Sequence, residues 1–456
     1  MENTIIRLIS VQLNNFKNIK QGTITLNKNK EKDFNFSSAD VLGIYGQNGS
    51  GKTAVIQVID IFQRIAIGRE LIKDIDNLVK INEKECSFAF KFALKIENEK
   101  KYLISYCCSI SKELKRLTKE KLMVSKLQED GNWSKMSPYF ECNYDDDIKV
   151  FEPLFRYNNV VNNNQDNIIK LSVALKLAQE NRISFLFSEN LINIIKDSKE
   201  SELYYLISIL KKYARENIFT ISNSHNGVIS LNAFLPLTVF HNINDVTFFG
   251  DIPIELQHPM ETNEKYFNLI SSVIKNMNGV VEAIVPGLSF EVKSYGKQML
   301  KDGSSGIRYE ILSNRYGSTF PLRYESEGIK RLFSELNVLI AMYNNSSILV
   351  AIDELDAGIF ESLLGTLIHV ISETGKGQLI FTSHNLRPLE MLDKENIMFS
   401  TTNENNRYIR MANIKDSNNL RDCYIRALSL GGQQEELGQE IKESAIRRAF
   451  RHAGGR

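Results

Sequence analysis

The chain has 456 residues, of which 43% are hydrophobic and 24% charged, and its formal net charge is +1. This length suffices for one large or two ordinary domains, and the composition is that of a globular protein. It excludes the global positive field that drives non-specific binding to nucleic acids. No apolar run approaches the roughly eighteen residues of a membrane span.

The cysteines predict free thiols. There are five of them, an odd number without a CxxC pair, namely Cys86, Cys107, Cys108, Cys142 and Cys423. We therefore expect neither disulfides nor a zinc site. The first residues, Met1 to Thr4, include an acid and lack the basic-then-apolar order of a signal peptide. The expected compartment is the cytoplasm.

Alternating and apolar segments predict strands in the first part of the chain. These expected strands lie at 5–8, 11–13, 22–26 and 41–45. A helix is expected at 54–65, because its apolar residues recur at helical spacing. The alternating segments 86–96 and 102–110 predict an antiparallel hairpin that turns near 97–100. Residues 1–150 are expected to form an N-terminal lobe.

The pattern changes after residue 150. The Asn-rich stretch 158–167 predicts a loop, and amphipathic helices are expected at 168–182 and 203–214. We expect 151–250 to be a mainly helical insertion, with too few heptads for a long coiled-coil arm. Three of its basic residues are interpreted as solvated helix charges, with contact to a partner or nucleic acid as the alternative. They are Lys211, Lys212 and Arg215.

Strands and helices alternate in the remainder, which predicts a parallel α/β sheet and a C-terminal lobe over 251–456. The expected helices begin near 267 and occupy 328–343 and 359–372, and the expected strands are 288–292, 307–312, 348–352 and 378–382. An amphipathic helix is expected at 435–451. Leu437, Ile441, Ile446 and Phe450 would form its apolar face, which either packs on the core or docks a partner.

A phosphate-binding loop is predicted between the strand 41–45 and the helix 54–65. The segment Gly46-Gln47-Asn48-Gly49-Ser50-Gly51-Lys52-Thr53 matches GxxxxGK[ST]. Its glycines let the backbone wrap around phosphates, and the following helix start favours an anion. Lys52 is expected to reach the β- and γ-phosphates of ATP, and Thr53 to ligate Mg²⁺. The alternative is a glycine-rich turn with an accidental lysine.

A pair of acids follows the apolar strand 348–352, at the edge where open α/β sheets bind ligands. Asp353 is expected to hold Mg²⁺ through water, and Glu354 to polarise the attacking water as general base. The alternative is a strand that ends in surface acids.

Further features narrow the class of ATPase. The acid pair lies about 300 residues after the phosphate loop, and Ser326 and Gly328 open a helix just before it. The segment 355–358 follows the acids, and the strand 378–382 leads to His384. This order resembles the signature, D-loop and switch histidine of ABC ATPases. A capped helix start that cannot reach its own phosphate loop would dock on the γ-phosphate bound by another subunit, so we expect at least a homodimer. An ordinary helix cap and a loop histidine are the alternatives.

With these residues placed, the chain resembles the SMC/RecF/Rad50-like ABC ATPases. The matching stretches are 13–19, the phosphate loop, 325–332, 352–358 and 381–385. The resemblance implies an α/β ATPase head with a mixed sheet and a mainly helical insertion, ATP and Mg²⁺ as cofactors, and a nucleotide contact from Lys17. Two departures stand out: Ser326-Glu327-Gly328 replaces Ser-Gly-Gly, and no glutamine is assigned to the Q-loop.

Within that superfamily the chain looks like the AAA15/OLD-like branch, in particular the AbiL/Rlo-type ATPases and the ATPase subunit of the PARIS system, and more distantly the OLD and Septu ATPases. This implies an ATP-hydrolysing sensor or scaffold of an anti-phage, abortive-infection system. It would control a separately encoded toxin or nuclease, with a phage protein as trigger. About 70 residues follow His384, which we expect to be too few for an added TOPRIM domain. The acidic run 145–147 is interpreted as a solvated turn rather than a metal cluster.

Two other functions compete with this one. A RecF/Rad50-like DNA-repair ATPase would clamp DNA directly and show DNA-stimulated hydrolysis. A nucleotide-binding subunit of a transporter would need a membrane partner. The helical insertion and the Phe16-Lys17 segment disfavour this transporter function.

Overall fold

The computed structural model describes residues 4–453 apart from 27–35, 97–99, 146–149, 224–226, 228, 230, 244–245, 301, 413, 416–417 and 439–442. A six-stranded central sheet has the order β18-β17-β3-β16-β15-β8. Its members are β3 (Asp40–Tyr45), β8 (Ile218–Ile221), β15 (Leu349–Ile352), β16 (Gln378–Thr382), β17 (Ile397–Ser400) and β18 (Tyr408–Ile409). All pairings are parallel except that of β18, so the α/β prediction is confirmed.

A second, antiparallel sheet has the order β2-β1-β4-β5-β6-β7. Its strands are β1 (Ile5–Phe16), β2 (Ile19–Thr25), β4 (Glu85–Lys95), β5 (Lys101–Ser111), β6 (Leu117–Lys126) and β7 (Ser137–Asn143). The predicted hairpin is β4–β5, with Glu85 opposite Ser111 and Lys95 opposite Lys101. Most of its expected turn, at 97–99, lies outside the described residues. Strands β6 and β7 were not predicted.

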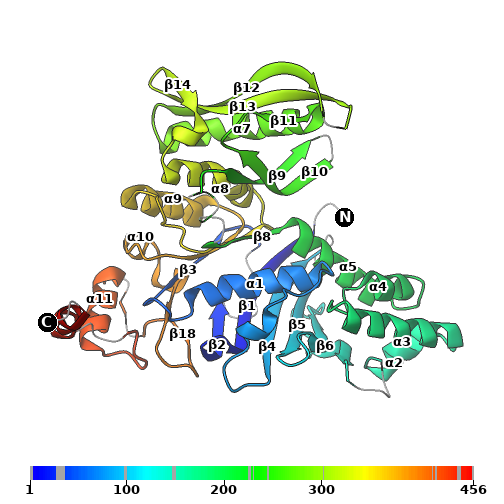
Figure 1. The fold of residues 1–456 in the computed structure, drawn as a ribbon. Helices are drawn as coiled ribbons and strands as arrows, with labels where there is room; N and C mark the ends of the chain where they lie inside the picture. Colours follow the sequence, from blue (N-terminus) through cyan, green and yellow to red (C-terminus); the bar gives the residue numbers. More distant parts are fainter. Residues whose placement is uncertain are drawn as a thin grey trace.

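Helix α1 (Lys52–Ala66) lies between these two sheets (Figure 1). Its buried residues share one apolar cluster with both sheets. On one side the Phe62 ring lies 4.6 Å from that of Phe90 and 5.1 Å from that of Phe92. The other face of the central sheet is covered by apolar residues of α8 (Glu327–Asn344), α9 (Glu361–Thr374) and α11 (Leu420–Leu430). Helix α1, which follows the phosphate loop, is thus packed between the central sheet and the antiparallel sheet.

Four helices follow the antiparallel sheet: α2 (Leu154–Val161), α3 (Gln165–Glu180), α4 (Glu189–Lys196) and α5 (Ser201–Glu216). The expected loop at 158–167 is mostly wrong, because α2 continues to Val161 and α3 begins at Gln165. The Asn-rich composition instead supplies a helix cap, since the Asn164 side chain accepts a hydrogen bond from the Asp166 amide. Lys211, Lys212 and Arg215 each form an ion pair with a glutamate.

Residues 231–344 build most of a further lobe with its own apolar core. Its elements are β9 (Phe234–Ile243), β10 (Val246–Glu255), β11 (Met260–Asn263), α7 (Glu264–Ile284), β12 (Leu288–Met299), β13 (Ser305–Arg315), β14 (Ser318–Pro321) and α8 (Glu327–Asn344). The β9–β10 hairpin falls in the stretch expected to be mainly helical, where β8 also lies. The helical part is thus α2 to α5, and the end of the stretch is extended.

The C-terminal helices are α9 (Glu361–Thr374), α10 (Pro388–Met391), α11 (Leu420–Leu430) and α12 (Glu443–Ala453), and short 3-10 helices occupy Ile75–Leu78, Leu322–Tyr324 and Lys394–Asn396. The expected helix at 435–451 is wrong for its first residues. Residues 435–438 are not helical, Leu437 is buried, and Ile441 lies outside the described residues. Among the described residues, no helix is both long and apolar enough to cross a membrane.

A buried carboxylate joins the helical segment to the antiparallel sheet. Glu120 on β6 is 1% exposed and accepts hydrogen bonds from Tyr106 and Tyr144 and from the hydroxyl of Ser184. The amides of Phe185 and Leu186 donate to it as well. Because a buried charge is tolerated only when its acceptor sites are filled, this cluster ties the segment between α3 and α4 to the sheet.

We predict that Glu120→Gln lowers the free energy of unfolding by about 3 kcal/mol, since an amide group would then face hydroxyl and N–H donors. Urea denaturation, followed by tryptophan fluorescence and circular dichroism, measures the effect. The exposed Glu113, in the β5–β6 turn, supplies the control Glu113→Gln. Equal unfolding midpoints for the two variants would contradict this role of Glu120.

Candidate nucleotide-binding site

The phosphate loop connects β3 to α1 as predicted. Gly51 caps α1 in a left-handed conformation with φ of 99°, which favours glycine. The Lys52 ammonium lies over the loop and donates to the carbonyl oxygens of Gly46 and Gln47 at 2.7 and 3.1 Å. Burial lowers the pKa of Lys52, and the nearby Asp353 carboxylate opposes that shift. The Ser50 hydroxyl closes the loop by donating to Gln47.

Asp353 follows β15 and brings the loop and the sheet together. Its Oδ1 accepts hydrogen bonds from the hydroxyls of Thr53, at 3.2 Å, and Thr382, at 2.6 Å. Asp353 is 1% exposed, and its Oδ2 accepts no hydrogen bond from any residue that the structure describes. An orphaned buried carboxylate oxygen beside a threonine hydroxyl fits the oxygen-ligand preference of Mg²⁺.

Glu354 has an unusual backbone conformation. Its φ of 53° is left-handed, which costs a residue with a side chain about 1–2 kcal/mol. Thr382 holds it in place, because its hydroxyl accepts a hydrogen bond from the Glu354 amide at 2.8 Å and its carbonyl accepts one from Leu355 at 3.0 Å. Such strain persists where the surroundings over-determine it, and it clusters at functional sites.

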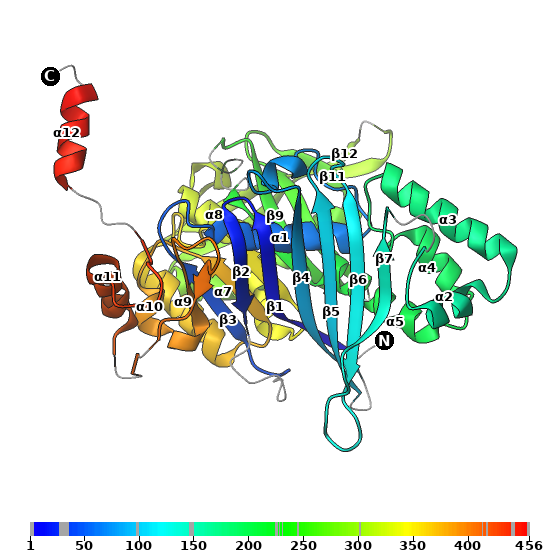
Figure 2. The ribbon, with the colours of Figure 1, turned by 90° about the horizontal axis from the view of Figure 1, so that it is seen from below.

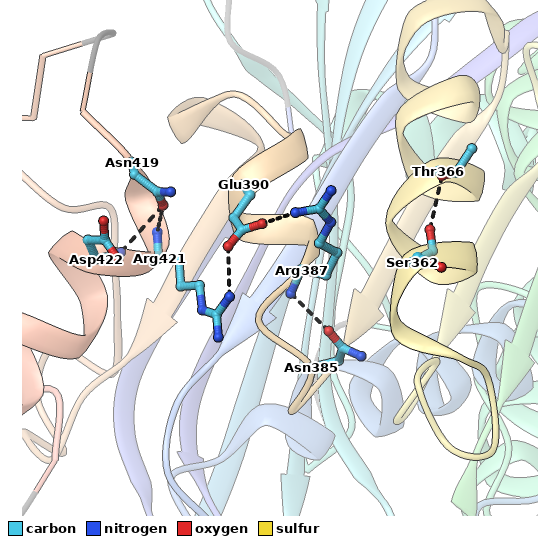
Figure 3. A network of polar contacts seen from close by, with 8 residues as sticks. All are labelled: Ser362, Thr366, Asn385, Arg387, Glu390, Asn419, Arg421 and Asp422. Atoms are coloured by element: carbon cyan, nitrogen blue, oxygen red, sulfur yellow. Dashed lines mark hydrogen bonds and ion pairs between the residues drawn. The ribbon is translucent and has the colours of Figure 1, made fainter.

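The loop that carries His384 is held by the acid of the predicted D-loop. Asp356 Oδ2 accepts hydrogen bonds from the backbone amides of His384 and Asn385 at 3.1 and 3.0 Å. Asn385 in turn accepts from the amide of Arg387, whose guanidinium pairs with Glu390 (Figure 3). Arg421 of α11 also donates to Glu390 at 2.8 Å, and together these pairs hold the pKa of Glu390 low. The histidine loop is thereby connected to α11.

One cleft of about 520 Å³ is lined by Lys52, Thr53, Asp353, Glu354, Thr382 and His384. Lys17, in the β1–β2 turn, contributes to it, and burial lowers the pKa of Lys17 while Asp353 opposes that shift. Asn18 also lines the cleft and donates to the Gly49 carbonyl at 2.6 Å. The sequence-predicted residues in the lining are Lys17, Asn48, Gly49, Gly51, Lys52, Thr53, Asp353, Glu354 and His384.

The start of α8 does not line this cleft. The Ser326 hydroxyl oxygen caps α8 by accepting a hydrogen bond from the Ile329 amide at 3.3 Å. Gly328 packs against Gly358 so closely that a Cβ at 328 would overlap the Gly358 carbonyl oxygen. Ser326 and Gly328 therefore lie beside the D-loop segment of their own chain, outside its phosphate cleft.

Two residues of the site were not assigned from the sequence. Thr382 contacts both acids, and its signal was a polar residue at the carboxyl end of the strand next to the acid strand. Arg331 on α8 is 3% exposed and donates to the backbone oxygen of Asp353 at 3.2 Å and to Glu335 at 2.9 Å. Nothing local in the sequence marks that contact.

Other candidate groups are placed elsewhere. Asp145 pairs with Arg116, whereas Asp146 and Asp147 lie outside the described residues. In the described part of the chain, no three His, Cys, Asp or Glu side chains are grouped to hold a metal ion. None of the five cysteines, all of which the structure describes, forms a disulfide, and burial raises the pKa of Cys86 to about 12.

Several solved structures align with most of this chain at low sequence identity. The Smc head domain with an extended coiled coil, bound to the C-terminal domain of ScpA from Pyrococcus furiosus, is 15% identical with a TM-score of 0.40, over 89% of this chain and 96% of that one. The SMC head domain from Thermotoga maritima is 13% identical (TM-score 0.36; 89% and 98% covered). RecF with ATPrS, a recombination mediator protein, is 12% identical (TM-score 0.37; 88% and 98% covered). Likeness at this level carries no inference about function.

No curated protein sequence matches the chain significantly. One family model does match, over residues 150–390, and its description is "AAA domain, putative AbiEii toxin, Type IV TA system". The matched part includes Ser326, both acids and His384 and begins after the phosphate loop. Because it covers more than half of the chain, the protein belongs to this AAA-domain family.

Proposed function

We propose that this protein is an ATPase of the ABC type whose active site is completed by a second copy of the chain. One observation carries the proposal: Lys52, Thr53, Asp353, Glu354 and His384 converge on a single cleft. Family membership supports ATP as the nucleotide. These residues come from the phosphate loop and from the ends of two neighbouring strands, and their side chains are of the types that hydrolysis of the β–γ phosphoanhydride of ATP uses.

Each group has a distinct role in hydrolysis. Lys52 and the loop amides would bind the phosphates, and Thr53 and Asp353 would hold Mg²⁺, which neutralises charge on the phosphate oxygens when bound. Glu354 would accept a proton from the attacking water, and His384, which lines the same cleft, would contact the γ-phosphate. Thr382 would orient the Asp353 carboxylate and hold the backbone of Glu354.

The composite character of the site rests on the start of α8. Ser326 and Gly328 present a capped helix N-terminus, which attracts anions through its dipole and free amides. Because this helix start lies outside the cleft of its own chain, we propose that it docks on the ATP bound by a second subunit. Glu327 is exposed there. Its negative charge would weaken that contact relative to a glycine.

We further propose that the nucleotide state of this dimer controls a separately encoded toxin or nuclease in anti-phage defence. The family description names a putative toxin and a type IV TA system. This supports placing the protein in a toxin–antitoxin pair. ATP binding would close the dimer and hydrolysis would loosen it, so an effector held by one geometry is released by the other.

We predict that Glu354→Gln lowers the ATP hydrolysis rate about 100-fold or more, because it removes the general base, and traps a closed ATP-bound dimer. Lys52→Ala should instead weaken ATP binding and leave a monomer. Phosphate release and analytical ultracentrifugation with ATP and Mg²⁺ measure the two properties. Hydrolysis at the wild-type rate by Glu354→Gln would show that the general base is another group.

A second prediction concerns Thr382. Thr382→Val preserves shape but removes the hydroxyl between the acids, so kcat should fall roughly 10- to 100-fold, the loss expected for hydrogen bonds to a charged group. The KM for ATP should change little, the Mg²⁺ concentration for half-maximal rate should rise, and Thr382→Ser should restore activity. Thr366→Val on the exposed face of α9 is the matched control. An unchanged kcat in Thr382→Val would exclude the positioning role.

The effector role is tested by a pull-down from the native host with the neighbouring gene product tagged. We expect Glu354→Gln to retain a small partner that is toxic when freed, and Lys52→Ala to retain less of it. Co-purified DNA and DNA-stimulated hydrolysis, without a protein partner, would contradict this role and favour DNA repair.

A further inference from the structure

The segment after α11 is fastened beside the phosphate loop. We call residues 435–438 the C-terminal strap. The Glu435 carboxylate accepts hydrogen bonds from the side-chain amides of Asn403 and Asn406 at 2.8 and 3.0 Å. The Glu436 carbonyl accepts two more from the backbone and hydroxyl of Thr402. The strap is thus bound to the β17–β18 loop at several points.

The end of the strap touches the phosphate loop itself. Leu437 is 2% exposed and belongs to the apolar core under the central sheet. Gly438 packs against the side chain of Gln47, so closely that a Cβ at 438 would overlap it. Helix α12 begins at Glu443, five residues after Gly438 in the sequence.

Helix α12 presents apolar and basic side chains to solvent. Every residue in it is exposed, and it projects from the rest of the molecule (Figure 2). Ile446 and Phe450 are one turn apart on the same face, and Phe450 is 76% exposed. Arg448 and Arg451 add positive charge, as does Arg447, which pairs with Glu443 within the helix. A basic helix with an aromatic anchor requires an acidic, apolar surface to cover it.

The chain itself carries such a surface at the starts of α8 and α9. Phe360 is 76% exposed, and Tyr324 is 70% exposed although the Arg323 guanidinium, which pairs with Glu310, lies 5.1 Å from its ring centroid. The acids Glu327 and Glu361, in the first turns of the two helices, are exposed as well. The contact between Gly328 and Gly358 holds the two helix starts together. We call these four side chains, Tyr324, Glu327, Phe360 and Glu361, the aromatic–acidic patch.

We propose that α12 of one subunit docks on the aromatic–acidic patch of a second copy. The inference rests on the proposed dimer, in which the phosphate loop of one chain faces the α8 start of the other. The strap brings α12 out at the phosphate loop, so the two surfaces meet at the edge of the same interface. Arg448 and Arg451 would then lie against Glu327 and Glu361, and the apolar side chains would cover one another. α12 would act as a clasp that closes with ATP.

The test uses the full-length chain with Glu354→Gln, ATP and Mg²⁺, and measures the dimer dissociation constant by analytical ultracentrifugation. Adding Phe450→Asp should weaken the dimer about tenfold or more, as expected for an aromatic anchor. Met299→Asp, at a residue that is 77% exposed on β12, should change nothing. ATP binding by the monomer, measured separately, should be equal in all three proteins, because α12 lies on the surface.

Charge reversal identifies the partner surface. Arg448→Glu with Arg451→Glu should weaken the dimer, and adding Glu361→Arg should restore part of the affinity. An unchanged dimer in Phe450→Asp, or no rescue by Glu361→Arg, would overturn the clasp while leaving the ATPase dimer intact. If the Glu354→Gln protein fails to dimerise with ATP at all, both the clasp and the composite site are refuted.

Discussion

The site is organised around the buried carboxylate of Asp353. Asp353 is 1% exposed, and its Oδ1 accepts hydrogen bonds from hydroxyl groups on two different elements. Thr53 contributes from the phosphate-loop helix and Thr382 from the neighbouring strand. Arg331 reaches the backbone oxygen of Asp353 from α8. The side chain and the backbone of Asp353 thus connect helix α1, the central sheet and α8.

Much of this arrangement could be predicted, because it depends on short patterns of neighbouring residues in the sequence. The phosphate loop needs glycines and a lysine at set spacings. Strands 41–45 and 348–352 are apolar throughout and strand 378–382 is apolar at its centre, as is typical of parallel strands buried on both faces. The ends of such strands meet at one edge, which places Asp353, Glu354 and His384 together without knowledge of the rest. The hairpin β4–β5 is equally local, since alternation alone defines it.

Features that depend on tertiary contacts were missed or placed wrongly. The four-residue β8 is too short to stand out, and it is a strand only because it pairs with β15. The asparagines near 160 indicate a loop by composition, yet one of them caps a helix. At 435–438 the apolar periodicity suggested a helix, but the Glu435 and Glu436 oxygens are held by the β17–β18 loop, and Leu437 is used as a core residue. Thr382 and Arg331 contact Asp353 across 29 and 22 residues, which no local pattern reveals.

The order of strands in the central sheet has a consequence for how the protein is made. β3 pairs with β16 and β17, which the ribosome produces more than 300 residues later. Thr53 and Asp353, which form a hydrogen bond, are 300 residues apart in the sequence. Pairing across such separations closes long loops, which slows folding and leaves β3 without neighbours during synthesis. A chain that ends before β15 contains the phosphate loop but lacks Asp353 and Glu354. In the proposed mechanism, a nascent or truncated form that ends before β15 lacks the acid pair and would not hydrolyse ATP, and its unpaired β3 edge would be open to chaperones.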